Sequence, residues 1–171
     1  MWHILLSILF ILLISLILCG CGNKTKFDIE EYKISASELA SRIDSNSSPY
    51  ANVASWELKF YNSITNVGGK FDAEYAFEHG TEWYCEETGL VWDDIIKEYD
   101  DVCKSYMDFI AIDIGDDYAA GQIRDEMSTL YNAYNSIVST VNNPSSSAFR
   151  SCATALQDFS SSLDLLNSYC K

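Results

Sequence analysis

The only local cluster of chemically versatile side chains in this sequence lies between positions 78 and 86, where glutamates surround the histidine His79. On a helix, His79, Glu82 and Glu86 would share one face, because residues three and four apart are neighbours there. Imidazole and carboxylate groups bind transition metals, but metal sites in helical bundles take such ligands from several facing helices. No Glu-x-x-His occurs in the chain. We therefore expect an exposed acidic face and no metal site.

Tryptophan provides a second candidate site, because an indole ring can hold a ligand or a glycan. Trp83 and Trp92 flank the acidic cluster. A ligand-binding interpretation combines these two rings with His79, Glu82 and Glu86. However, most aromatic residues of the chain lie on or beside apolar stripes, where packing in the core explains them without a ligand.

Signatures of catalysis are missing from the sequence. His79 is the only histidine after position 21, and no serine lies in a Gly-x-Ser-x-Gly elbow. Gly68-Gly69 is not followed by the Gly-Lys-Ser/Thr of a phosphate-binding loop. The acidic residues between positions 113 and 117 lack the spacing of an EF-hand. We expect no catalytic residues and no cofactor.

Four cysteines follow position 21, and an even number in an exported domain suggests disulfides. Their spacing gives two equal intervals of 18 residues, which correspond to five helical turns. Two neighbouring helices would therefore form two cross-links, whose pairing depends on whether the helices are antiparallel or parallel. The alternative is four buried free thiols. The candidates are Cys85, Cys103, Cys152 and Cys170.

The N-terminal segment indicates export. Residues 2–18 form an almost unbroken apolar run that ends in Leu18-Cys19-Gly20-Cys21, and polar residues follow. This tetrapeptide resembles the lipobox of bacterial lipoproteins. The resemblance covers residues 1–21 and implies cleavage before Cys21, attachment of a lipid to Cys21, and anchoring on the extracytoplasmic side of the cell membrane. The run lacks a preceding Lys or Arg, and an uncleaved anchor helix or simple secretion are the alternatives.

Charge is distributed very unevenly along the chain. The formal net charge is −14, and residues 72–126 alone contain 17 acidic side chains against three basic ones. Such a surface excludes nucleic acid as a partner, because binding phosphates requires Lys and Arg. It also disfavours electrostatic adhesion to anionic lipid, so a lipid on Cys21 would have to hold the protein at the membrane. A solubilising face explains the charge more simply than a cationic partner or Ca²⁺ does.

Helical periodicity organises most of the chain after position 34. Residues 21–34 have no periodicity and predict a tether, and Ser35 to Glu38 match a capping box that would begin the first helix of a domain spanning residues 35–171. Ser48-Pro49 predicts a break and a restart of that helix. Residues 71–88 fit either a helix or a short strand pair. Clear apolar stripes then follow over residues 92–110, 119–141 and 149–170.

Short loops between these stripes predict an all-α domain, a bundle of four to five mostly antiparallel helices with one or two disulfides. For function, the sequence favours a non-catalytic module that binds another envelope or extracellular protein. The alternative is a lipoprotein that binds a small ligand or a cation through residues 72–126. A protein-binding module predicts an exposed aromatic patch without an enclosed pocket, whereas a ligand binder predicts a cavity lined by tryptophans.

Overall fold

The protein is an all-α bundle, as the sequence predicted. The computed structural model describes residues 27–171, so the signal peptide, the lipobox and Cys21 lie outside the described residues. No strand occurs between residues 27 and 171, which rules out the strand pair considered for residues 71–88. Within this range, no helix combines the length and the apolar composition that crossing a bilayer would require. The helices are α2 (Ile29–Asn66), α3 (Ala73–Thr88), α4 (Trp92–Ile110), α5 (Tyr118–Asn142) and α6 (Ser146–Tyr169).

The first described helix begins earlier than the sequence indicated. The side chain of Asp28 caps α2 by accepting a 2.9 Å hydrogen bond from the Glu30 amide, and two glutamates in the first turn favour this end of the helix dipole. Tyr32 is buried and stacks on Phe109 with the ring centroids 4.6 Å apart. The prediction of a tether through residue 34 and a helix start at Ser35 was therefore wrong, because packing on α4 extends the helix toward its N-terminus.

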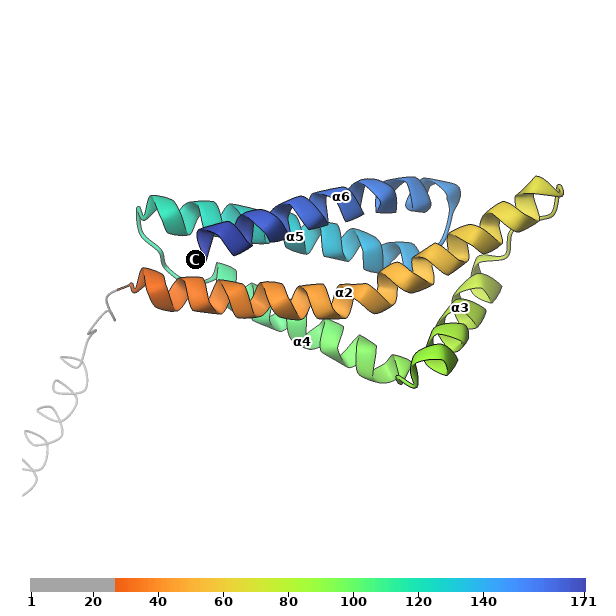
Figure 1. The fold of residues 1–171 in the computed structure, drawn as a ribbon, viewed down its shortest axis with the longest axis horizontal. Coiled ribbons are helices and arrows are strands. Elements are labelled where there is room, and N and C mark those ends of the chain that lie inside the picture. Colours follow the sequence, from red (N-terminus) through yellow and green to blue (C-terminus); the bar gives the residue numbers. More distant parts are fainter. Residues whose placement is uncertain (1–26) are drawn as a thin grey trace, which may run out of the picture.

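Pro49 lies inside α2 and does not end it, contrary to the predicted break. Proline removes one backbone hydrogen bond and costs about 3 kcal/mol in a helix interior. Tertiary contacts hold the helix together here. The buried Asn46 amide donates a hydrogen bond to the Ile95 carbonyl at 3.2 Å, and its oxygen accepts one from the Tyr134 hydroxyl. Figure 1 shows the axis of α2 changing direction near its middle, as expected for a helix with an internal proline.

Helix α2 is the centre of the bundle, because it contacts each of the other four described helices. The antiparallel pair α5 and α6 packs on α2, and α4 packs on α2 as well (Figure 1). Large rings bridge α4 and α5: Tyr106 stacks on Tyr131 at 3.7 Å, and the Tyr99 hydroxyl donates to the Asn135 side chain at 3.1 Å. The core is therefore both apolar and aromatic.

The predicted disulfides are not formed, because all four cysteines between residues 27 and 171 are free. Cys85 lies on α3, which packs mainly against α2. Cys103 of α4 points toward tyrosines of α4 and α5. Cys152 and Cys170 lie near opposite ends of α6. The equal spacing that suggested cross-links thus places the thiols in separate parts of the fold.

Candidate interaction surface

Helix α3 and the outer half of α2, residues 53–66, form a two-helix projection that we call the arm (Figure 1). Asp72 caps α3 by accepting a hydrogen bond from the Tyr75 amide at 3.1 Å, and Gly89 ends it with a φ of 70°. The helices approach closely at Gly80, where an added Cβ atom would lie 3.1 Å from Trp56 and 3.2 Å from Val53. The glycine that weakens the helical pattern of α3 thus allows α3 to pack directly on α2.

Five rings of the arm form a continuous row across both helices, which we call the aromatic row. The rings stack successively, with centroid distances of 3.7 Å from His79 to Tyr75 and 5.4 Å from Tyr75 to Phe60. Phe60 lies 5.6 Å from Trp56, and Trp56 lies 6.5 Å from Trp83. Tyr75 is 44% exposed and Trp83 is 37% exposed. A large part of this stacked surface therefore faces solvent.

The structure divides the predicted ligand-binding residues into two groups. His79 and Trp83 belong to the aromatic row, and Glu82 and Glu86 are exposed on α3. The His79 Nδ1 atom lies 3.1 Å from the Tyr75 carbonyl oxygen, within its own helix. Trp92 packs inside the bundle instead, with its ring centroid 5.3 Å from that of Tyr50 and 6.4 Å from that of Tyr84. Trp83 and Trp92 thus do not belong to one ligand-binding surface.

No group of three His, Cys, Asp or Glu side chains in residues 27–171 is placed to hold a metal ion. The predicted face of His79, Glu82 and Glu86 lies on a single helix with the histidine stacked on Tyr75. What the arrangement offers is a row of partly exposed rings beside carboxylates.

Three members of the aromatic row were missed as site residues by sequence reasoning. The sequence pattern places Phe60 on an apolar stripe, Trp56 on the flank of that stripe and Tyr75 in the ambiguous segment 71–88, because a helical repeat indicates which residues share a face but not what covers that face. A usable signal was present. Trp56 and Phe60 are four residues apart, and the small residue Gly80 occurs in the partner helix, which together indicate close packing beside large rings.

A buried acid lies directly beside the aromatic row. Glu57 is fully buried, and neither of its carboxyl oxygens has a hydrogen-bond partner. Burial away from water raises the pKa of Glu57 to about 8, so the group is mostly neutral at pH 7. Its Cγ atom would lie 3.5 Å from a Cβ atom on Gly80. Burial raises the pKa of the Cys152 thiol on α6, and an ionised Glu57 would raise it further. Glu57 thus lies where the arm joins the bundle, and no pattern in the amino-acid sequence indicates that this residue is buried there.

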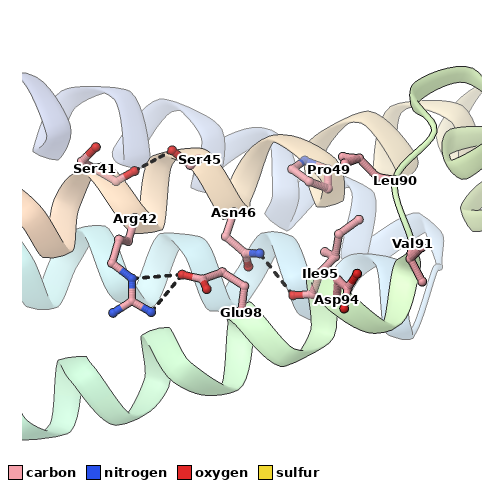
Figure 2. A pocket seen from close by; sticks show the side chains of 10 residues that line it. All are labelled: Ser41, Arg42, Ser45, Asn46, Pro49, Leu90, Val91, Asp94, Ile95 and Glu98. Atoms are coloured by element: carbon pink, nitrogen blue, oxygen red, sulfur yellow. Dashed lines mark hydrogen bonds and ion pairs between the residues drawn. The ribbon is translucent and has the colours of Figure 1, made fainter.

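A groove runs between α2 and α4 (Figure 2). Its volume is about 350 Å³, and it is open to solvent. Arg42 crosses it to Glu98, with Nη2 and Oε1 2.9 Å apart, and also donates to the Ser105 hydroxyl at 2.8 Å. The exposed Leu90 and Val91 form its apolar end. No tryptophan lines this groove or the other hollows along α2/α4, α2/α6 and α5/α6.

Comparisons with known protein families, with curated proteins and with solved structures find no match for this chain. The aromatic row and the groove are therefore the features that can indicate a function.

Proposed function

We propose that this protein is a lipid-anchored module on the extracytoplasmic side of the membrane, and that it binds another envelope or extracellular protein without catalysis. The observation that carries the binding role is the aromatic row, whose rings lie partly exposed on a two-helix arm. The anchoring role rests on the lipobox-like Leu18-Cys19-Gly20-Cys21.

Exposed tryptophan and tyrosine rings favour a protein partner. These residues are enriched among the side chains that contribute most to protein–protein binding, because they bury a large area while losing few rotamers. The aromatic row is partly exposed along its length, and none of the four hollows described above is lined by a tryptophan. A small molecule is usually enclosed by its pocket, whereas a protein partner can cover such a surface.

The geometry of α2 fits a membrane-anchored binder. The helix begins at Ile29, only a few residues after Cys21, and its 38 residues extend about 57 Å at 1.5 Å per residue. The turn between α2 and α3 lies at the opposite end of the molecule from Ile29 (Figure 1). A lipid on Cys21 would thus leave the arm as the part of the domain farthest from the anchor.

The binding role is tested by photo-crosslinking in intact cells that make the protein naturally. Ser63 is exposed on α2, three residues from Phe60, so a photoreactive amino acid there would leave every ring in place. Ser160 is exposed on α6 and is the matched control. We expect a discrete cross-linked protein from position 63 and none from position 160. Equal cross-linking at both positions, or none at position 63, would contradict the proposal.

The anchoring role needs a separate measurement. Mass spectrometry of the mature protein should show a lipid-modified Cys21 at the N-terminus, and the Cys21→Ser variant should leave the membrane fraction. Retention of residues 1–20 would instead indicate an uncleaved anchor helix, and an unmodified Cys21 would indicate simple secretion.

A second candidate function is binding of a small ligand or cation in the groove of Figure 2. The observation in its favour is the combination of an apolar end at Leu90 and Val91 with the carboxylates of Asp94 and Glu98. A lipophilic cation such as tetraphenylphosphonium is a suitable probe. Binding that is lost in the Val91→Arg variant would support this function, and unchanged binding in that variant would reject the groove as the site.

A further inference from the structure

We propose that the partner presents a segment rich in lysine and arginine, which lies along the aromatic row with its cationic groups on the ring faces and among the carboxylates of α3. This inference rests on the proposed function and names the chemistry of its partner.

The stacking geometry of the aromatic row suits cations. Neighbouring rings are nearly parallel, with interplanar angles of 19° for His79 and Tyr75, 29° for Phe60 and Tyr75, 12° for Trp56 and Phe60, and 22° for Trp56 and Trp83. Tyr75 is stacked between His79 and Phe60, whereas Trp83 ends the row with Trp56 as its one stacked neighbour and is 37% exposed, so its second face is the one that can take a cation. Ammonium and guanidinium groups are attracted to such faces, and tryptophan attracts them most strongly.

Helix α3 carries only negative charge beside the aromatic row, and Lys59, next to Phe60 on α2, is the one basic side chain of the arm. Residues 71–91 contain six acidic side chains and no lysine or arginine. Glu82 and Glu86 follow Tyr75 by seven and eleven residues, so they lie on the same face of α3 as that ring. Each of the three ion pairs found within residues 27–171 lies outside α3. The glutamates of α3 are thus free to pair with charges supplied by a partner.

Other partners fit this surface less well. A purely apolar segment or a neutral glycan would displace water from the glutamates without providing opposite charge, which is unfavourable. A second copy of this chain would bring the same acidic α3 and a net charge of −14 against the first. A basic segment alone satisfies both the rings and the carboxylates, and electrostatic attraction would also speed its association.

The test uses the full-length mature protein in detergent and two synthetic peptides. One peptide alternates arginine with serine, and the other has citrulline, a neutral analogue, in place of each arginine. Isothermal titration calorimetry at low ionic strength measures their affinities. We expect the arginine peptide to bind, the citrulline peptide to bind at least about tenfold more weakly, and the affinity for the arginine peptide to fall as salt is added.

Three variants separate recognition by the surface from general attraction to an acidic protein. Trp83→Leu removes an exposed ring and keeps the charge, and we expect about a two- to fivefold loss of affinity. Glu82→Gln with Glu86→Gln removes two charges beside the aromatic row, and we expect a loss of about fivefold or more. Asp158→Asn with Asp164→Asn removes two exposed charges from α6 and should change the affinity less than twofold. Circular dichroism checks that each variant stays helical.

Three outcomes would overturn the inference. If the citrulline peptide binds as tightly as the arginine peptide, the surface does not recognise cations. If the α6 control weakens binding as much as the α3 variant does, the attraction depends only on net charge. If position 63 cross-links to a partner in cells while the arginine peptide fails to bind, this inference is wrong and the proposed function still stands.

Discussion

The buried carboxyl group of Glu57 should make the stability of this protein depend on pH. Its pKa is raised by burial to about 8 in the folded chain, against an ordinary value of 4.5. Between these values the folded state holds a proton that the unfolded chain has released. The contribution of Glu57 to stability is therefore highest below the ordinary pKa, falls as the pH rises, and becomes constant above about pH 8.

The size of this effect follows from the difference between the two pKa values. One pKa unit corresponds to about 1.36 kcal/mol, so the folded protein could lose up to about 5 kcal/mol as the pH rises from below 4.5 to above 8. Entry of water or movement of the arm would relieve part of the cost, and we expect a loss of about 2 to 5 kcal/mol. Since whole domains have stabilities of about 5–15 kcal/mol, this loss is readily measurable.

Glu57→Met is the informative substitution, because it keeps the approximate volume and removes the ionisable group. Urea unfolding followed by circular dichroism would give the free energy of unfolding at about pH 5, 7 and 8.5. We expect the variant to be more stable than the wild type by about 1–3 kcal/mol at the lowest pH, where a neutral unpaired carboxyl is still buried. The difference should increase toward the highest pH.

Other buried groups fall outside this pH window. Burial also raises the pKa of the Cys152 and Cys170 thiols above the ordinary 9.0, and it raises the pKa of Tyr50 to about 12. These groups would reduce stability only at higher pH. The exposed Glu86→Gln variant is the control and should keep the wild-type dependence on pH. If Glu57→Met retains that dependence as well, the burial argument for Glu57 is refuted.

Three further predictions concern packing and redox state. The added methyl group of Gly80→Ala should clash with Trp56 and loosen the packing of the arm. We expect faster hydrogen exchange in residues 73–88, and unchanged exchange would show that the arm tolerates the methyl group. Asn46→Leu should lower the free energy of unfolding in urea by about 2–4 kcal/mol, because the Tyr134 hydroxyl and the Ile95 carbonyl both lose their hydrogen-bond partner. A decrease below about 1 kcal/mol would mean that water replaces the amide. Reductant should leave the thermal midpoint unchanged, since the four described cysteines are free, and a lower midpoint would reveal a disulfide.

Local signals predicted many helix boundaries well. Asp117 caps α5 by accepting from the Ala120 amide, and Ser145 caps α6 by accepting from the Ala148 amide, and both residue types are favoured at the N-terminal cap of a helix. Gly89 ends α3 in the left-handed conformation that favours glycine. Such boundaries depend on a few neighbouring residues, and the sequence shows these directly.

Features that depend on distant contacts could not be predicted in this way. Pro49 stays inside a helix because Asn46, one turn earlier, forms hydrogen bonds to Ile95 and Tyr134. Both partners are distant from Asn46 in the sequence. The cysteines of α3, α4 and α6 share a regular spacing, but the packing of helices decides which side chains meet. The aromatic row became visible only when α3 was placed on α2, since its rings come from both helices.

The central position of α2 has a consequence for the order of folding. This helix is made first, yet the helices that cover its inner side, α5 and α6, are made last. While the chain is being synthesised or exported, only α3 and α4 can cover α2, so the side of α2 that faces α5 and α6 stays exposed. Helices α5 and α6 are adjacent in sequence and can pair quickly through local contacts, so we expect this hairpin to form first and α2 to dock onto it afterwards. The chain would thus stay open until its last helix is available.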